Sequence, residues 1–198
     1  MPRRADPRME EGILNAAQKL WQTGGERALT IRRIAEAAGT NTPTIYRRFK
    51  GRRDIEFALV QRVQRDLISA LQSSRSPEET CVRYVEFGMN HTREYRLLQA
   101  HTCEPPASIS PPGRSTTWNS KPIVELIGKQ LAGRLGGSAG EHLRLSLALW
   151  ALAHGTTTLL MSQWVTKRNA RELRAAFAAA LDTLTCSGIL ANNDLWSG

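Results

Sequence analysis

Apolar residues recur three and four positions apart along most of the chain, and no stretch between turn signals alternates strictly between apolar and polar residues. The first spacing places side chains on one face of an α-helix, whereas strict alternation is typical of a β-strand. The pattern therefore predicts an all-α fold.

Four helices are predicted before residue 74. The first has one apolar stripe, formed by Ile13, Ala16, Ala17, Leu20 and Trp21, and it ends at the glycine pair 24–25. A second helix of about two turns begins after Thr30, whose hydroxyl can cap it. The third spans residues 43–49, because Pro43 suits the first turn of a helix. The fourth spans residues 54–73.

Further helices are predicted as a pair from residue 77 to about 98, and then at residues 122–135, 141–167 and 170–184. Residues 104–121 contain several prolines, serines and threonines, which predicts a loop of unusual length. The segment 143–164 is apolar on nearly every side, so we expect more than one neighbour to cover it. Residues 1–8 are rich in proline and arginine and are expected to form a flexible basic arm.

Composition is that of a folded soluble protein, since 41% of the 198 residues are apolar and 23% are charged. The longest apolar run, residues 147–153, is far too short to cross a membrane, and the N-terminus lacks the apolar block of a secretory signal. The 3 cysteines lie far apart without paired spacing, which is typical of a reducing cytoplasm. We therefore expect a cytoplasmic protein that does not bind membranes.

Positive charge is concentrated at the start of the chain. Residues 1–55 hold 12 Lys and Arg against 6 Asp and Glu, whereas residues 56–198 hold 15 against 12. Nucleic acid, an anionic membrane surface or an acidic partner could each attract such a segment. Residues 30–50 favour nucleic acid, because two short helices around a glycine turn have the layout of a helix-turn-helix that fits the major groove of DNA. A helical hairpin with a solvated basic face is the alternative.

The same region contains specific residue types at fixed spacing. They are Thr30, Ile34, Ala35, Ala38, Gly39, Asn41, Thr44, Ile45, Tyr46 and Phe49, followed by a basic residue and then by Asp54 and Ile55. This set resembles the DNA-binding region of the TetR family of transcriptional regulators over residues 9 to about 57, although Thr40 stands where the family usually has valine. The resemblance implies a homodimer whose two heads enter successive major grooves of double-stranded DNA.

It also implies three parts of the chain: a flexible arm at residues 1–8, an N-terminal three-helix helix-turn-helix domain at 9–53, and a C-terminal helical domain at 54–198 that binds an effector and dimerises. A small molecule bound by the last domain would release the DNA. The helix at residues 54–73 joins the two domains and is expected to transmit this change.

The resemblance further implies which residues contact DNA: Thr30, Arg32, Thr42, Pro43, Thr44, Tyr46, Arg47, Arg48, Lys50 and Arg52. Residues 42–44 occupy the start of the recognition helix, where base edges come within reach, and Tyr46 matches a tyrosine whose hydroxyl meets a phosphate. Arg32 holds a position from which some members reach a guanine. Thr30 and Arg52 lie at helix starts that attract phosphate. For the two arginines after Tyr46, a merely solvated role is the alternative.

The C-terminal domain offers candidates for an effector site. Aromatic, sulfur-containing and a few polar residues could line a pocket for an uncharged or cationic apolar or aromatic effector: Tyr84, Phe87, Met89, Trp118, Trp150, His154, Thr158, Met161 and Trp164. Ordinary core packing is the alternative for each of them. The spacing of Trp150, His154 and Gly155 also resembles a subgroup of these domains that is marked by Trp, His and Gly.

The last two predicted helices are expected to form a four-helix dimer interface, as in the resembled family. The stripe that would face the partner consists of Leu173, Phe177, Leu181 and Leu184. Small alanines beside this stripe would permit close approach of the helices.

No catalytic apparatus or cofactor motif is present in the sequence. His91, His101 and Cys103 lack the spacing of metal ligands, and no Gly-rich phosphate loop or serine-nucleophile motif occurs. We therefore expect a ligand-responsive transcriptional repressor, not an enzyme, without a cofactor. The alternatives are a constitutive DNA-binding regulator and a small-molecule carrier or enzyme whose basic head is incidental.

Overall fold

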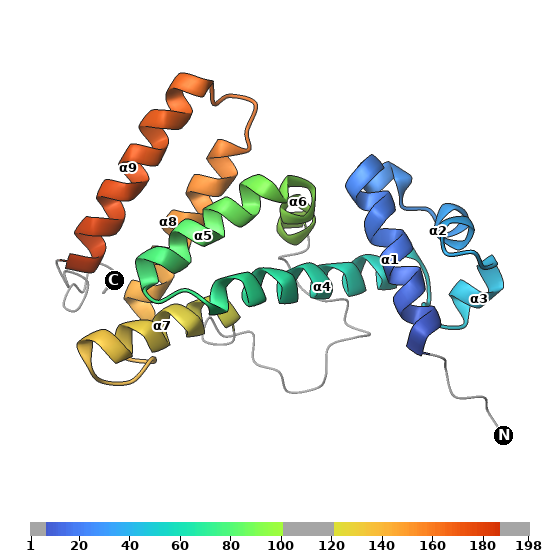
Figure 1. Ribbon diagram of the computed structural model, residues 1–198, viewed down its shortest axis with the longest axis horizontal. Helices are drawn as coiled ribbons and strands as arrows, with labels where there is room; N and C mark the ends of the chain where they lie inside the picture. Colours follow the sequence, from blue (N-terminus) through green and yellow to red (C-terminus); the bar gives the residue numbers. More distant parts are fainter. Residues whose placement is uncertain (1–6, 101–120, 187–198) are drawn as a thin grey trace, which may run out of the picture. The chain divides into compact units, whose positions relative to one another are not determined.

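The computed structural model describes residues 7–100 and 121–186. These residues form nine α-helices and one short 3-10 helix, with no strand among them (Figure 1), which confirms the predicted all-α fold. Residues 1–6 of the predicted arm and 104–120 of the predicted loop lie outside the described residues, as do His101 and Cys103. The remaining arm residues, Pro7 and Arg8, are part of the first helix.

The helices follow the predicted order. They are α1 (Pro7–Gly24), the 3-10 helix η1 (Gly25–Ala28), α2 (Ile31–Ala37), α3 (Thr42–Tyr46), α4 (Arg52–Gln72), α5 (Pro77–Asn90), α6 (Thr92–Ala100), α7 (Pro122–Leu135), α8 (Leu143–Leu160) and α9 (Lys167–Cys186). No helix in the described ranges is both long and apolar enough to cross a membrane.

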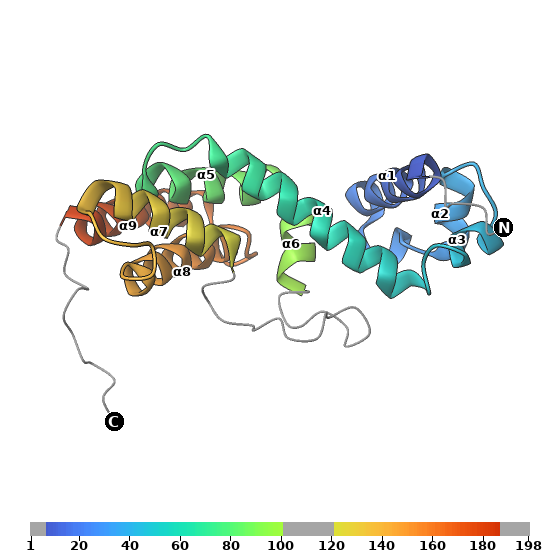
Figure 2. The same ribbon diagram turned by 90° about the horizontal axis from the view of Figure 1, so that it is seen from below.

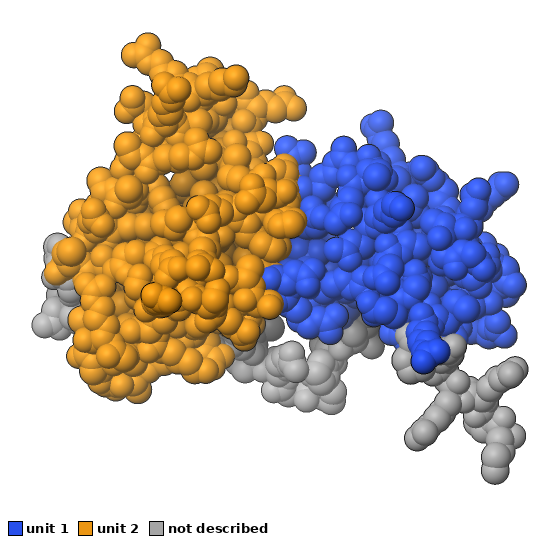
Figure 3. Space-filling model, in the orientation of Figure 1, with its two compact units in different colours: residues 1–66, 93–110 blue, residues 67–92, 111–198 orange. Residues whose placement is uncertain are grey.

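The described residues divide into two compact units (Figure 3). Unit 1 holds residues 7–66 and 93–100, and unit 2 holds residues 67–92 and 121–186. The division falls inside α4, after Asp66, and at the start of α6. Unit 1 is therefore a helix-turn-helix head to which α6 is added.

The core of unit 1 consists of the apolar stripes that the sequence predicts. Most of the α1 stripe is buried, Leu20 being intermediate, and the residues of unit 1 with no exposed surface are Ile13, Ala17, Leu29, Ile34, Ile45 and Ile55. Each large aliphatic side chain withdrawn from water contributes about 1.5–3 kcal/mol to folding. Gly25, at φ 62°, takes the left-handed conformation that ends α1, as its position predicts.

Arg62 of α4 ties α4 to α1. Its guanidinium donates to Glu11 Oε1 at 2.6 Å, to Asn15 Oδ1 at 2.7 Å and to Gln18 Oε1 at 3.1 Å, and the residue is 8% exposed. A buried arginine is costly unless its donors are paired. These three acceptors on consecutive turns of α1 therefore hold the first helix against the fourth.

The start of α6 is fastened to the end of α1 in a similar way. The Trp21 indole N–H donates to the Arg93 carbonyl at 2.9 Å, and the Gln22 amide donates to Glu94 Oε1 at 2.7 Å. The Arg93 guanidinium donates in turn to the Gln22 carbonyl. Polar contacts between residues about 70 positions apart thus place α6 in unit 1.

In unit 2, α8 packs against α5, α7 and α9 (Figures 1 and 2). This arrangement explains why α8 is apolar on nearly every side: Leu149 and Ala153 have no exposed surface, and Ile127 and Leu131 of α7 are buried equally deeply. Burial is not complete, because Ala151, Thr158 and Leu159 of α8 are exposed.

Three helices have a predicted end that differs from the structure by three residues or more. The helix predicted at 141–167 is shorter, since α8 spans Leu143–Leu160 and α9 already begins at Lys167. At its end the Ser162 hydroxyl donates to the Leu159 carbonyl at 2.7 Å, and the Thr166 hydroxyl accepts from the Asn169 N–H at 3.2 Å, capping the next helix. The helix predicted at 43–49 ends at Tyr46.

Candidate functional site

Local contacts shape the two short helices of the head. The Thr30 hydroxyl accepts from the Arg33 N–H at 3.3 Å and caps α2, as predicted, while the Asn41 side chain accepts from the Thr44 N–H at 2.9 Å and caps α3. Gly39, at φ 62°, lies between them in a conformation that side chains with a Cβ rarely adopt. The capping role of Asn41 was missed, although an Asn before Thr-Pro is a recognisable helix start.

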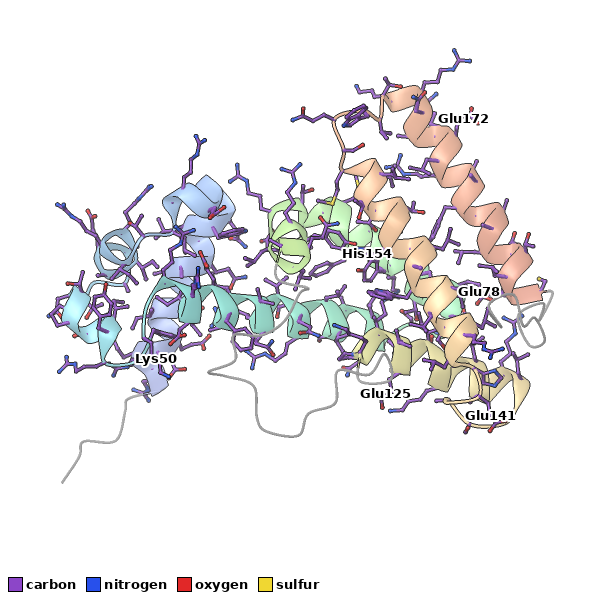
Figure 4. The ribbon with its side chains drawn as sticks, turned by 180° about the vertical axis from the view of Figure 1, so that it is seen from behind. Lys50, Glu78, Glu125, Glu141, His154 and Glu172 are labelled. Carbon is purple, nitrogen blue, oxygen red and sulfur yellow. The ribbon has the colours of Figure 1, made fainter. Side chains whose placement is uncertain are left out.

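Most of the predicted DNA contacts lie on the surface of this helix-turn-helix. The exposed ones are Thr30, Arg32, Pro43, Tyr46, Arg47 and Lys50, and those of intermediate exposure are Thr42, Arg48 and Arg52. Tyr46 is 58% exposed, although a tyrosine side chain is usually largely covered. Figure 4 labels Lys50, which follows α3. Because Ile34 and Ile45 are fully buried, the outer face is polar and basic while the inner face is apolar.

Thr44 differs from its neighbours. It is only 7% exposed, and its hydroxyl accepts a hydrogen bond from the Arg47 guanidinium at 2.8 Å. The sequence predicts that this side chain meets base edges, but the structure places it within the head, in contact with an arginine.

Arg52 is engaged with carboxylates. Its Nε donates to Glu56 Oε1 at 2.6 Å and its Nη2 donates to Glu26 Oε1 at 2.9 Å. The hydrogen bond to Glu56, and then the attraction of Glu56 and Glu26, raise the pKa of the guanidinium against the opposing effect of burial. Part of the charge of Arg52 is therefore already neutralised within the head.

Three of the residues predicted for an effector site are brought together in unit 2. The Tyr84 hydroxyl of α5 and Nδ1 of His154 of α8 are 3.0 Å apart and share a hydrogen bond. The rings of Trp150 and His154 lie 5.6 Å apart, one turn from each other on α8 (Figure 4 labels His154). Burial lowers the pKa of His154, which favours the neutral imidazole. The arrangement brings the partly exposed rings of Trp150 and His154 next to a buried tyrosine hydroxyl.

The other predicted effector residues are less closely associated. Phe87 contacts the ring of His91 at 4.6 Å, Met89 and Met161 are partly exposed, and Thr158 donates from its hydroxyl to the His154 carbonyl. Trp164 lies beyond the end of α8 with 89% of its surface exposed, whereas the sequence predicts that it belongs to the same helix as His154. Trp118 lies outside the described residues.

The stripe predicted for dimerisation lies largely inside the single chain. Phe177 and Leu181 are 7% and 3% exposed, while Leu173 and Leu184 are intermediate. They face the rest of unit 2, because α9 packs against α8 and α5. The exposed side of α9 carries four alanines, Ala175, Ala176, Ala178 and Ala179, among charged residues such as Arg171, Glu172 and Asp182.

The described residues contain no group of three or more His, Cys, Asp or Glu placed to hold a metal ion. Burial, together with the nearby Glu78 carboxylate, raises the pKa of the Cys81 thiol to about 12, so this cysteine is protonated and unreactive.

Comparison with known proteins gives two family matches. Residues 13–59 match the family model for bacterial regulatory proteins of the tetR family, and residues 78–184 match the one for the tetracyclin repressor-like C-terminal domain. The second match does not confirm the resemblance to the Trp-His-Gly subgroup. No curated protein sequence matches the chain.

Solved structures share the fold at low sequence identity. The regulatory protein SCO4313 is 18% identical, with a TM-score of 0.66 over 89% of this chain and 95% of that one. BioQ of Mycobacterium smegmatis is 22% identical, with a TM-score of 0.55 over 89% and 98%. A TetR-family transcriptional regulator from Streptomyces coelicolor is 18% identical, with a TM-score of 0.54 over 87% and 98%. The two family matches over both parts of the chain show that it belongs to the TetR family of bacterial regulators, which are DNA-binding transcription factors and not enzymes.

Proposed function

We propose that this regulator is a repressor that binds a palindromic operator as a homodimer and is released by a small apolar or aromatic effector. The observation that carries the proposal is the exposed polar face of α2 and α3, on which Arg32, Tyr46 and Arg47 lie above a fully buried core. Such a face is what a major groove and its flanking phosphates require. A DNA-binding protein of this kind would work in the cytoplasm.

On this proposal the exposed residues divide into two roles. Thr30, Tyr46 and Lys50 contact phosphates, which positions the head on the DNA without recognising its sequence. Arg52 also contacts the phosphates, although part of its charge is already neutralised. Arg32, Thr42 and Pro43 approach base edges. Arg48 is half-buried and is assigned to a contact with the DNA backbone.

The proposed dimer interface is the outer face of α8 and α9. This face has four exposed alanines on α9, among charged residues, and the exposed Ala151 and partly exposed Gly155 on α8. Small residues let helices approach closely, because interhelical distance depends on the side chains at the contact. The leucines and phenylalanine of α9 support this interface from within each chain.

The proposed effector site is the cluster of Tyr84, Trp150 and His154. Its rings supply apolar contact, and the shared hydrogen bond between Tyr84 and His154 supplies a polar group that a ligand could engage. No charged residue occurs between Leu145 and Val165, so the preferred ligand would be uncharged or cationic. Because α4 is one continuous helix with residues in both units, a conformational change in unit 2 can be transmitted to the head through it.

Selection of tight-binding duplexes from random DNA tests the proposal. We expect inverted repeats whose half-sites lie about one helical turn, roughly 34–36 Å, or a multiple of it apart. Affinity should fall steeply as salt rises, because Lys and Arg displace counterions from phosphates. Selected duplexes without an inverted repeat would contradict the dimeric docking.

Titration with a panel of apolar compounds tests the effector. Release of the selected duplex and a change in tryptophan emission should follow the same ligand concentration, and His154→Ala should shift both curves together. If no compound in a broad panel releases DNA, a constitutive regulator is favoured instead.

A further inference from the structure

The hydrogen bond between Thr44 and Arg47 assigns different tasks to two neighbouring residues of α3. The Thr44 hydroxyl is withdrawn from the surface, since this residue is 7% exposed, whereas Arg47 is exposed. At 2.8 Å, Nη2 of Arg47 donates to the Thr44 oxygen. A buried threonine whose oxygen already accepts from an arginine is poorly placed to reach a base edge.

The contact also determines where the guanidinium lies. Arg47 follows the last residue of α3, and its backbone N–H donates to the Pro43 carbonyl at 3.2 Å. Without the threonine its long side chain could extend past the end of the helix. The bond to Thr44, the middle residue of α3, instead draws the guanidinium back alongside the helix. In helix-turn-helix proteins the N-terminal residues of the recognition helix meet base edges, so an arginine drawn back toward them comes nearer to the bases.

The guanidinium keeps enough donors for recognition. An arginine has five N–H donors in a rigid planar fork, and Thr44 accepts only one of them. The remaining donors suffice for the bidentate contact by which arginine binds O6 and N7 of guanine. An arginine that is already restrained loses less conformational freedom when it makes that contact.

We propose that Arg47 reads a guanine in each half-site and that Thr44 is its positioning residue, without base contact of its own. This inference rests on the proposed function, because it needs a DNA half-site facing α3. It differs from the expectation in the sequence analysis, in which Thr44 meets bases and Arg47 contacts DNA without an assigned partner or is merely solvated.

The test is selection of duplexes followed by affinity measurements on single-base variants, at several salt concentrations. Arg47→Ala should remove a guanine preference at one position of each half-site, reducing discrimination there by roughly ten- to a hundredfold. Arg47→Lys keeps the charge but not the fork, so it should lose the same preference while the salt dependence stays close to that of the wild type.

Three threonine variants separate positioning from packing. Thr44→Val keeps the shape but removes the acceptor, so it should weaken discrimination at the same position and at no other. Thr44→Ser keeps the hydroxyl, so it should keep the wild-type preference. Thr40→Val, in the turn of the same motif, is the matched control and should behave as the wild type.

Two results would overturn the inference. If Arg47→Ala weakens all duplexes equally and reduces the salt slope by about one, Arg47 binds a phosphate. If Thr44→Val and Thr44→Ser both keep the wild-type preferences, Thr44 does not position Arg47. If the wild-type protein selects no inverted repeat, the proposed function itself is overturned. If the wild type selects one and Arg47→Ala shows the same base preferences within it, only this inference is overturned.

Discussion

The helix-turn-helix of unit 1 and the polar cluster of unit 2 are built by contacts of very different range along the chain. In the head, the bonds from Arg33 to Thr30, from Thr44 to Asn41 and from Arg47 to Thr44 each join residues three positions apart. In unit 2, the bond between Tyr84 and His154 joins residues 70 positions apart. A site assembled by near neighbours leaves a readable pattern in the sequence, whereas a site assembled by distant helices depends on how they pack.

The two regions also differ in where their polar groups lie. The head presents Arg32, Tyr46 and Arg47 to solvent, and an apolar layer supports them from below. Unit 2 holds its polar pair partly buried between α5 and α8. Changes on the exposed face of α2 and α3 should therefore act mainly on DNA binding, and changes in the interior of unit 2 mainly on folding.

The largest effect is expected when the interior of unit 2 is charged. Leu181→Lys places a cation where the leucine is 3% exposed, and a buried unpaired charge should lower the free energy of unfolding by about 4 kcal/mol or more. Thermal unfolding followed by circular dichroism measures this loss.

Ala179→Lys is the matched control, because Ala179 lies on the exposed side of the same helix. It should keep the helical signal but shift sedimentation from dimer to monomer if this face is the interface. If Leu181→Lys unfolded at the same temperature as the wild type, α9 would not pack as described.

The next effect concerns Arg62, the long-range tie of unit 1. Arg62→Ala removes three hydrogen bonds and leaves their acceptors on α1 without this donor, so we expect a loss of about 1–3 kcal/mol. Denaturant unfolding measures it. Arg65→Ala, an exposed arginine on the same helix, should stay within about 0.5 kcal/mol of the wild type. Equal losses in both variants would mean that the buried network contributes nothing specific.

A smaller effect is expected at the cap of the recognition helix. Asn41→Ala should cost about 1 kcal/mol, because the Thr44 N–H loses its side-chain acceptor. Faster hydrogen exchange at residues 42–46 and weaker binding to the selected duplex would report it. Asn41→Asp keeps the acceptor and should exchange as the wild type does. Unchanged exchange in the alanine variant would show that packing alone holds α3.

The smallest effect is expected from the titration of His154. Burial lowers its pKa in the folded protein below the ordinary value of 6.5, so the folded state binds fewer protons than the unfolded state just below that pH. The contribution to stability is therefore complete above pH 6.5 and is lost as pH falls through the folded pKa. His154→Gln should flatten this part of the pH–stability curve.

Thr158→Val, one turn away on α8, is the non-titrating control and should keep the wild-type pH dependence. A His154→Gln variant with the wild-type slope would show that another group causes the change.

The same contrast between short-range and long-range contacts explains which elements could be predicted from the sequence. The α2 cap, the glycine turn at Gly39 and the buried stripe of α1 depend on residues within one or two turns, and each was predicted correctly. The end of α8 was not, because apolar residues recur past Leu160, while the chain leaves the helix there and Thr166 caps a new one. Trp164 was misplaced for the same reason.

The sequence by itself determined that the chain is helical, that it carries a helix-turn-helix and that it resembles TetR regulators, because helical periodicity, caps and turn residues act over a few positions. Only the tertiary structure decided that Thr44 is buried against Arg47, that Phe177 and Leu181 face the interior, and that α6 is fastened to α1. An apolar stripe shows that a helix face is covered but not by what. The element that covers this face is determined only by how all the helices pack together.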